Sequence, residues 1–384
     1  MKLDVNFLSA KSADGVYKIT AKGAVVASLH WADANGILTE WTPFAYVPVL
    51  PNGTGIFRYT GGRAVPEKAE YILVRAVTPD FLHTDEVMYK IPDEQKSGAV
   101  KDGIKFCLMS DLHLSNKPWK IKQALSMAAD ADCVLIAGDL VNDGTQRQFQ
   151  MMSDIIDGYD KMVFAVSGNH DYPLNPVPCV GEGIYDYYSL QRKLLGRAAE
   201  NGCDIEFDIS GAYAARMGDI EIIGLNAAAH WRRLTFKKGS QLEWLEDYID
   251  KRSAARWRII LCHAPLIMHN PQRPKNGTPY LGRDKALQKI IDSNERIIFA
   301  SGHTHISPGD YMGCVEYDSS RQNIYINDGS ICPTTYKSKE PLSTEEWTDG
   351  IVTELVLGNS GIEISAKSVK SGQYVSRGHY RIIK

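Results

Sequence analysis

Residues 104–113 read Ile-Lys-Phe-Cys-Leu-Met-Ser-Asp-Leu-His, an apolar run that ends abruptly in a polar cluster. Four later apolar runs end in the same way. They are followed by Gly138-Asp139, by Ser167 to Asp171, by His263, and by Ser301 to His305. Short apolar runs bounded by such residues are typical of buried strands. The five clusters therefore predict five strands, each with polar side chains at its carboxyl end.

Helical segments separate these strands. Residues 118–130 place Ile121, Leu125 and Ala128 on one face, and residues 145–157 show the same spacing. A third helix is predicted to begin at Ser240, because Glu243 three residues later completes a capping box. The predicted strands of this region are 104–109, 133–137, 162–166, 221–225, 257–262, 297–300 and 324–326, with further β character in 351–369. Alternation of strands and helices predicts a layered α/β domain.

The first 90 residues follow a different rhythm. Short β-rich runs at 16–20, 24–29, 44–50, 55–59 and 71–77 alternate with turn signals such as Ala34-Asn35-Gly36 and Pro51-Asn52-Gly53. This spacing predicts an all-β sandwich of the immunoglobulin or fibronectin-III type, interpreted as an accessory domain. Residues 91–103 are polar and contain Gly and Pro, so they are the candidate linker. We expect a β-sandwich at 1–95 and a catalytic domain at 96–384.

Composition narrows the class of protein. The net charge is −3 and 23% of residues are charged, which argues against a dedicated nucleic-acid or anionic-membrane binder. The sequence has no apolar run of 18 residues and no signal-peptide pattern at its start. The seven cysteines form no CxxC pair, which favours reduced thiols over a disulfide framework or a zinc knuckle. We expect a cytoplasmic protein without a membrane partner.

The polar clusters have the chemistry of a metal site. Carboxylates and imidazoles together suit Mn, Fe, Zn, Co or Ni, and the absence of thiolates argues against structural zinc. Strand ends converge in α/β sheets, and the Gly before Asp139, Asn169 and His303 allows close approach of the backbone. A single Asp after a strand is usually a turn residue, and a single His is usually a core residue. The predicted ligands are therefore argued as a set: Asp111, His113, Asp139, Asn169, His263, His303 and His305.

Seven ligands are enough for two metal ions. Two ions about 3.5–4 Å apart would share a water, and the Asp139 carboxylate could bridge them. The sequence resembles the calcineurin-like metallophosphoesterase superfamily in an ordered set of five motifs. These are DLH at Asp111, GDLVNDG from Gly138, GNHD from Gly168, CHAP around His263 and GHTH from Gly302. The resemblance covers residues 104–335 and implies a four-layer α/β/β/α core with two divalent or trivalent metal ions. It implies no other cofactor.

The resemblance also implies a role for each ligand. The first metal would take Asp111, His113, bridging Asp139 and His305. The second would take Asp139, Asn169, His263 and His303. His170 lies outside the ligand positions, and the resemblance implies that it donates a proton to the leaving oxygen as general acid. Asn142 or Asp143 is a candidate to orient His170.

The subgroup follows from one position. Purple acid phosphatases have a Tyr ligand three residues after the bridging Asp, whereas this sequence has Asn142 there. The motifs are most similar to the class III cyclic-nucleotide phosphodiesterase and glycerophosphodiesterase group. The expected activity is hydrolysis of a small phosphodiester or phosphomonoester by in-line attack of a metal-bridging hydroxide.

Two other functions stay open. A nuclease of the DNA-repair type shares these motifs but would need a basic groove. A non-catalytic scaffold with the same fold would need degraded ligands, and all seven are present. Substrate specificity is expected in loops 172–190, 227–239 and 265–285, where Arg232 and Arg233 are candidates to contact phosphate. The expected partner is a small phosphoester rather than nucleic acid. The oligomeric state is open, with a homodimer as one option.

Overall fold

The computed structural model describes residues 3–7, 15–21, 23–39, 45–49, 54–59, 69–79, 84–90, 103–116, 118–172, 182–230, 233–252, 255–269, 280–306, 308, 315–332, 350–359 and 361–383. The chain forms two compact units. One comprises residues 1–102 with 358–363 and 379–384, and the other comprises residues 103–357 and 364–378. The expected boundary at 95/96 lies outside the described residues and stays a prediction. No local pattern in the sequence indicated that two C-terminal segments belong with the first unit.

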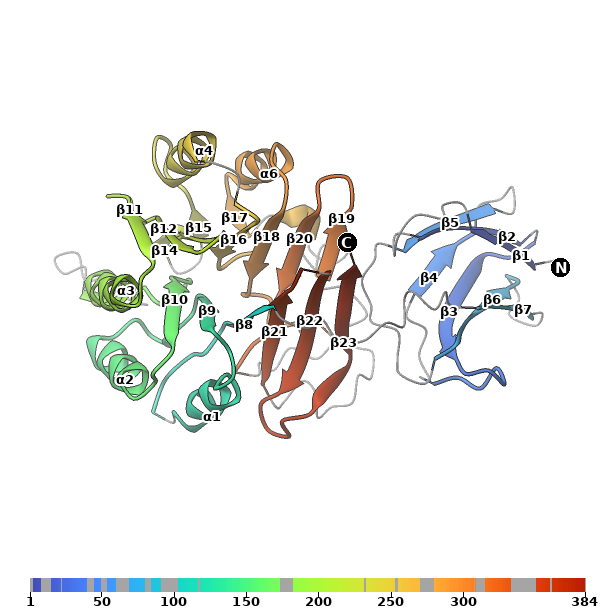
Figure 1. The fold of residues 1–384 in the computed structure, drawn as a ribbon, viewed down its shortest axis with the longest axis horizontal. Coiled ribbons are helices and arrows are strands. Elements are labelled where there is room, and N and C mark those ends of the chain that lie inside the picture. Colours follow the sequence, from blue (N-terminus) through green and yellow to red (C-terminus); the bar gives the residue numbers. More distant parts are fainter. Residues whose placement is uncertain are drawn as a thin grey trace. The chain divides into compact units, whose positions relative to one another are not determined.

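The described strands of residues 1–102 form two antiparallel sheets (Figure 1). One has the order β1 (Leu3–Phe7), β2 (Gly15–Ala21), β5 (Thr54–Tyr59). The other has the order β4 (Ala45–Pro48), β3 (Val26–Ala32), β6 (Tyr71–Val77), β7 (Thr84–Lys90). Leu29, Trp31, Ile72 and Val74 are buried in one cluster. The all-β character agrees with the prediction, whereas β1 and β7 were not predicted.

A six-stranded sheet carries the first three polar clusters. Its order is β10 (Met162–Val166), β9 (Cys133–Ala137), β8 (Ile104–Met109), β21 (Ile351–Leu357), β22 (Gly361–Ser368), β23 (Tyr374–Ile383). Strands β10, β9 and β8 are parallel, and β21 pairs antiparallel with β8. Because parallel strands end at the same edge, Asp111, Asp139 and Asn169 follow neighbouring strand ends.

A seven-stranded sheet carries the other two clusters. Its order is β11 (Asp204–Phe207), β12 (Tyr213–Met217), β13 (Ile220–Leu225), β16 (Trp257–Cys262), β18 (Ile297–Ser301), β20 (Asn323–Asn327), β19 (Val315–Asp318). Strands β13, β16, β18 and β20 are parallel. The central strands are buried along their whole length, as expected when both faces of a parallel sheet are covered. A small sheet joins β14 (Ala228–His230), β15 (Arg233–Thr235) and β17 (Leu281–Gly282).

Helices cover one face of each large sheet (Figure 1). Helices α1 (Trp119–Met127), α2 (Gln146–Asp157) and α3 (Glu182–Glu200) pack on β8 to β10 through a cluster that includes Ile121, Phe149 and Tyr187. Helices α4 (Gln241–Lys251) and α6 (Asp284–Asp292) pack on β13, β16 and β18 through Leu245 and Leu287. The two sheets meet where the ring of Phe164 in β10 stacks on Tyr213 in β12. The mixed α/β class is therefore confirmed.

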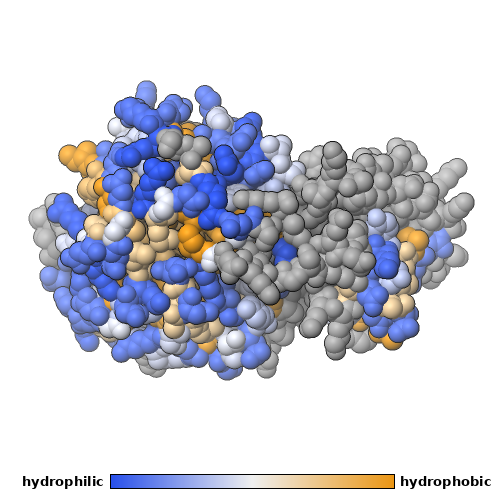
Figure 2. Space-filling model, in the orientation of Figure 1, coloured by the Kyte–Doolittle hydropathy of each residue, from blue (hydrophilic) through white to orange (hydrophobic). Residues whose placement is uncertain are grey.

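The outward side of the helices is polar. Helix α6 buries Leu287, Ile290 and Ile291, and hydrophilic residues cover α4 and α6 on the face drawn in Figure 2. Within the described part of the chain, the helices are all too short or too polar to cross a membrane. The five described cysteines are free thiols. Four are buried and Cys332 is half-buried; the buried four are Cys107, Cys133, Cys203 and Cys262. Cys179 and Cys314 lie outside the described residues.

Two helices differ from the sequence-based expectation. Residues 172–190 were expected to be a specificity loop, but α3 already begins at Glu182. Helix α6 occupies the end of a second expected loop, 265–285. One glycine and three tyrosines at the start of α3 have modest helix propensity, so the local signal for a helix is weak. Packing of Tyr187 and Leu190 against the sheet stabilises the helix instead.

Candidate metal centre

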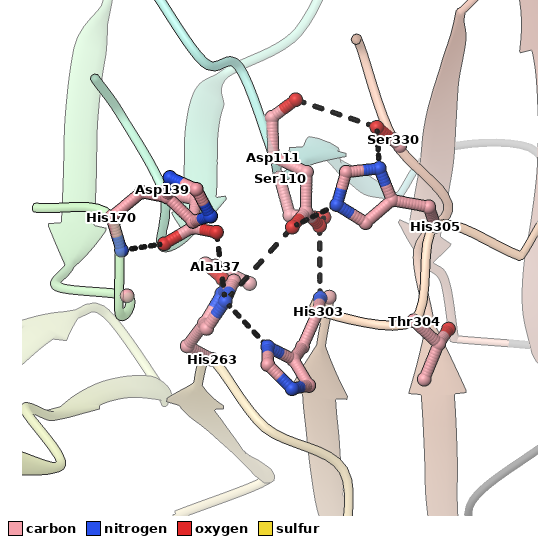
Figure 3. Close-up of polar contacts among 12 residues, drawn as sticks. Ser110, Asp111, Ala137, Asp139, His170, His263, His303, Thr304, His305 and Ser330 are labelled. Carbon is pink, nitrogen blue, oxygen red and sulfur yellow. Dashed lines mark hydrogen bonds and ion pairs between the residues drawn. The ribbon is translucent and has the colours of Figure 1, made fainter. Parts of the chain in front are cut away.

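The seven predicted ligands follow the carboxyl ends of five strands from both large sheets. Figure 3 shows Asp111 after β8, Asp139 after β9, His263 after β16, and His303 and His305 after β18, with their polar atoms directed toward one another. Asn169 follows β10 and is 8% exposed. The structure brings six of the seven side chains together: Asp111, His113, Asp139, His263, His303 and His305. Their role as ligands is a proposal.

The backbone at the site is unusual. Five of the predicted ligands have positive φ: Asp111 (50°), His113 (42°), Asp139 (53°), His303 (66°) and His305 (56°). Only three other described non-glycine residues share this conformation. Left-handed backbone is costly for residues with a Cβ and gathers at functional sites, where the surrounding structure enforces it. The sharp turns after β8, β9 and β18 thus aim side chains that an ordinary loop would send elsewhere.

Glycines allow the close approach of the loops around Asp139. Gly138 has φ of 90°, and a Cβ there would lie 2.6 Å from Nδ1 of His263. A Cβ on Gly168 would overlap with Oδ1 and the backbone nitrogen of Asp139 and lie 2.8 Å from its Cγ. Both positions are far inside van der Waals contact, so only glycine fits. The expected role of glycine before Asp139 and Asn169 is supported by this geometry.

Each carboxylate uses one oxygen to fix its own position. Oδ2 of Asp111 accepts the backbone N–H of His303 over 2.9 Å and lies 2.6 Å from Oγ of Ser110. Oδ1 of Asp139 accepts the backbone N–H of His170 over 2.8 Å. The second oxygens are left for the centre of the site. Oδ1 of Asp111 lies 3.0 Å from Nε2 of His305, and Oδ2 of Asp139 lies 3.3 Å from Nε2 of His263.

The imidazole rings are oriented by carbonyl oxygens behind them. Nδ1 of His263 donates to the carbonyl of Ala137 over 2.7 Å, which leaves Nε2 for the site. Nδ1 of His305 lies 3.2 Å from the carbonyl of Cys332 and 3.1 Å from Oγ of Ser330. A backbone or carboxylate acceptor behind the ring is the arrangement that fixes the tautomer of metal-binding histidines.

The inward-facing atoms match a metal site better than a hydrogen-bond network. Nε2 of His113 faces Nε2 of His305 over 3.4 Å, and Nδ1 of His303 faces Nε2 of His263 over 3.1 Å. Oδ1 of Asn169 is buried without a hydrogen-bond partner, and Oδ1 of Asp111 faces the rings of His305, His113 and His263. Buried polar atoms are almost always satisfied, so such a group of lone-pair donors calls for a cation. The residues present therefore fit divalent metal ions.

The ligand-type atoms form overlapping groups. Asp111, His113 and His305 offer atoms within 4.8 Å of one another, as do Asp111, Asp139 and His263. Asp139 also belongs to a third group, with His113 and His170. Asp111, His113 and Asp139 each belong to two of the three groups, so the groups form one continuous cluster. The first group contains three of the four residues expected at the first metal.

The charges of the site interact strongly. Burial alone would lower the pKa of His263, but the Asp139 and Asp111 carboxylates outweigh it and raise that pKa to about 10. Burial and the neighbouring His263 lower the pKa of His303 to about 4. Burial would raise the pKa of Asp111, but His305 and His263 hold it far below its usual range. The carboxylates of Asp111 and Asp139 therefore strongly favour positive charge in the space that they face.

His170 lies at the rim of the ligand group. Its ring stands edge-on to that of His113 with 4.5 Å between centroids. Its Nδ1 donates to the backbone carbonyl of Asn142 over 2.8 Å. Asn142 was a candidate to orient His170, and the contact is made by its backbone rather than its side chain. The side chain of Asn142 instead donates to Asp143 over 2.8 Å. The Asp171 carboxylate accepts the backbone N–H groups of Val141 and Gly168.

Sequence reasoning missed three residues behind the site. Ser110 and Asp328 hold the Asp111 carboxylate, with Ser110 Oγ 2.6 Å from Oδ1 of Asp328. Gln148 contacts the loop that holds His170. Ser110 was visible as the residue before Asp111, whereas Asp328 and Gln148 carry no motif. The side chains of residues 228–233 lie outside the described set, so the suggested phosphate contacts of Arg232 and Arg233 stay predictions.

The family model for the calcineurin-like phosphoesterase matches residues 104–307, more than half of the 384 residues. The fold and the site define a metallophosphoesterase-type protein, and the chain belongs to the calcineurin-like phosphoesterase family. A curated relative is 21% identical over 211 residues, which cover 52% of this chain and 77% of that protein. It is described as a probable cyclic nucleotide phosphodiesterase from Ruthia magnifica subsp. Calyptogena magnifica.

Similar solved structures include the purple acid phosphatase PPD1 from yellow lupin. That match has a TM-score of 0.43 and 14% identity, and covers 99% of this chain and 74% of the other. GAP50, the anchor in the inner membrane complex of Plasmodium, gives a TM-score of 0.46 at 14% identity. That match covers 74% of this chain and 90% of GAP50. Yfce, a phosphoesterase from E. coli, gives a TM-score of 0.33 at 14% identity. That match covers 73% of this chain and 100% of Yfce.

Proposed function

We propose that the protein is a dinuclear-metal-dependent phosphoesterase that hydrolyses a small phosphodiester or phosphomonoester. One observation carries the proposal: six carboxylate and imidazole side chains from the strand ends of both large sheets converge. Asn169 follows the neighbouring strand β10, and its Oδ1 is buried without a hydrogen-bond partner. A phosphodiester is the preferred class, because the curated relative is described as a probable cyclic nucleotide phosphodiesterase. At 21% identity that relative suggests a class and no particular substrate.

The proposed first metal is held by Asp111, His113, Asp139 and His305, and the second by Asp139, Asn169, His263 and His303. When bound, two such ions supply neutralisation of the phosphate oxygens and activation of a water for in-line displacement. The proposed metals are Mn, Fe, Zn, Co or Ni, which all accept this mixture of oxygen and nitrogen ligands.

The protein itself contributes orientation and a proton donor. The hydrogen bond from Nδ1 of His170 to the carbonyl of Asn142 confines proton exchange on this ring to Nε2. We assign His170 as the general acid that protonates the leaving oxygen at this atom. The backbone N–H of His170 also holds Oδ1 of Asp139, so the donor and the proposed bridging ligand are fixed in one loop.

The wider architecture is also part of the proposal. Helices on one face of each sheet and contact between the sheets support a four-layer α/β/β/α core. Two antiparallel sheets with a shared apolar cluster support an immunoglobulin-like accessory sandwich. Free cysteines at the five described positions support a cytoplasmic location.

Hydrolysis of a bis-aryl phosphodiester and of an aryl phosphomonoester, with Mn²⁺ added, tests the function. Asn169→Ala should lower kcat/KM by about 100-fold or more, because it removes a proposed ligand. Asn201→Ala, an exposed residue after α3, serves as the control and should retain activity. Thermal unfolding of both variants checks that they are folded.

The ester assay, together with an assay on DNA and a metal analysis, separates the alternatives. No turnover of either ester by wild-type protein that holds metal would overturn small-phosphoester hydrolysis. Turnover of DNA alone would indicate the nuclease. Metal content near zero after supplementation would favour the non-catalytic scaffold.

A further inference from the structure

One peptide group joins His170 to the first turn of α2. The carbonyl of Asn142 accepts the hydrogen bond from Nδ1 of His170 over 2.8 Å. The N–H of the same peptide group, which belongs to Asp143, donates to Oε1 of Gln148 over 2.9 Å. A peptide group is planar and its C=O and N–H point in opposite directions. Whatever fixes the N–H therefore fixes the direction of the carbonyl.

Gln148 is itself held in one orientation. Its Nε2 donates to Oδ2 of Asp143 over 2.8 Å, and Oδ1 of Asp143 accepts from Asn142 over 2.8 Å. Reversing the Gln148 amide would set its NH₂ against the Asp143 N–H and its oxygen against a carboxylate. Only the observed orientation satisfies all these atoms. The side chain is also 8% exposed, so water competes little for these bonds.

The helix adds a second restraint. Thr145 is the N-cap of α2 and accepts the backbone N–H of Gln148 over 3.4 Å. The backbone N–H of Asn142 donates to the carbonyl of Leu114 over 3.1 Å, which holds the near side of the loop but leaves the next peptide plane free to rotate. Gln148 removes that freedom. Its reciprocal pair with Asp143 is thus the restraint on the carbonyl that faces His170.

We propose that Gln148 is a positioning residue for His170, acting through the peptide plane between Asn142 and Asp143. By fixing that plane, Gln148 keeps the proton on Nδ1 and directs Nε2 toward the ligand group that includes His113 and Asp139. The catalytic part of this inference rests on the proposed function. The part that concerns the orientation of the His170 ring is independent of the proposed function.

The first test is independent of activity. In metal-free protein at one fixed pH, ¹⁵N–¹H correlation spectra should show a protected Nδ1–H signal that His170→Asn removes. Gln148→Leu should weaken or abolish that signal, because the carbonyl is no longer held. Gln150→Leu, on the exposed face of the same helix, is the matched control and should leave it unchanged. An unchanged signal in Gln148→Leu overturns the proposal, even if the wild type hydrolyses nothing.

A charge exchange tests the pair directly. Gln148→Glu keeps the acceptor for the Asp143 N–H but sets two carboxylates against each other, so the signal should again weaken. Adding Asp143→Asn restores one donor and one acceptor between the side chains, and the double variant should recover the signal. Failure of the double variant to recover it, while it unfolds at the wild-type temperature, counts against the pair.

Enzyme kinetics test the catalytic part of the proposal. With aryl phosphodiesters, Gln148→Leu should lower kcat/KM by about 10-fold or more when the leaving group is poor, and by much less when it is 4-nitrophenol. In a His170→Ala background the same change should cost nothing further. Equal losses for all leaving groups, or an added loss in that background, would show that Gln148 serves structure alone. Absence of any turnover by the wild type would instead refute the proposed function and leave the spectroscopic result to decide.

Discussion

The backbone N–H of His303 donates to Oδ2 of Asp111 over 2.9 Å, so the loop after β18 is tied to the carboxylate after β8. These strands belong to different sheets. The hydrogen bond therefore joins the two halves of the site and assigns the two oxygens of Asp111 to different tasks. Oδ2 carries the cross-sheet contact, and Oδ1 faces Nε2 of His305 at 3.0 Å.

Asp111→Asn should abolish the first metal site while preserving the fold. The amide oxygen will take the Oδ2 position, since two donors face it, and the NH₂ group will then point at His305 and the metal position. We expect metal affinity at this position to fall at least about 100-fold, which metal analysis after dialysis measures. Asp247→Asn, an exposed partner of Lys251, is the control. Two ions retained per chain in Asp111→Asn would contradict the assignment.

The gathering of the polar clusters at the strand ends could be predicted from sequence because its signal is local. Each cluster follows an apolar run, and strand ends in α/β sheets meet at an edge. Residues that act from behind the site lack such a signal. Asp328 reaches Ser110 across 218 positions of sequence, and Gln148 contacts its loop from an ordinary helix face. Only the folded structure reveals these partners.

The same distinction explains the missed elements of the fold. Strand β7 reads Thr-Asp-Glu-Val-Met-Tyr-Lys and has little apolar character, so its conformation follows from pairing with β6. Helix α3 opens with residues of modest helix propensity, and its packing against the core of the sheet compensates. The five strands at the site are mostly apolar, and their bounds were predicted to within one residue.

Asp328→Asn should change the pH dependence of stability in metal-free protein. Burial raises the pKa of Asp328 well above its usual range, so the folded protein keeps it protonated as a donor to Ser110 Oγ. The unfolded chain ionises it above its ordinary pKa of about 3.8, and the wild type therefore loses stability as pH rises beyond that value. Asparagine keeps a donor and does not ionise.

The D328N variant should thus gain stability relative to wild type as pH rises above about 4, by on the order of 1 kcal/mol per pH unit, until Asp328 ionises in the folded protein. Urea unfolding at several pH values measures this difference. An infrared band of a protonated carboxyl, present in wild type and absent in D328N, provides an independent check. A stability difference that stays constant with pH would show that Asp328 is ionised in the folded protein.

Glu243→Gln should have the opposite pH dependence. Arg283 and backbone N–H groups at the start of α4 lower the pKa of Glu243 to about 2, below its ordinary 4.5. The stabilisation is present above pH 4.5 and is lost as pH falls toward 2. Because Glu243 is 41% exposed, we expect only about 0.5–1 kcal/mol at pH 7. Urea unfolding of Glu243→Gln and of the exposed Glu246→Gln at pH 7, 5 and 4 tests this. A difference that grows toward pH 4 would be inconsistent with the paired carboxylate.

Gly168→Ala should damage both stability and metal binding. The new Cβ would overlap with Oδ1 and with the backbone nitrogen of Asp139, and backbone cannot move aside as a flexible side chain can. We expect a loss of about 1–3 kcal/mol in the free energy of unfolding, together with loss of the ions proposed to bind Asp139. Gly196→Ala is the matched control, because its Cβ would meet nothing within 4 Å on α3 and should be neutral or stabilising by about 0.5–1 kcal/mol. Thermal unfolding and metal analysis of both variants decide the matter. Full metal content in Gly168→Ala would mean that the loops around Asp139 can separate without cost, and that the close approach of these loops is not what builds the site.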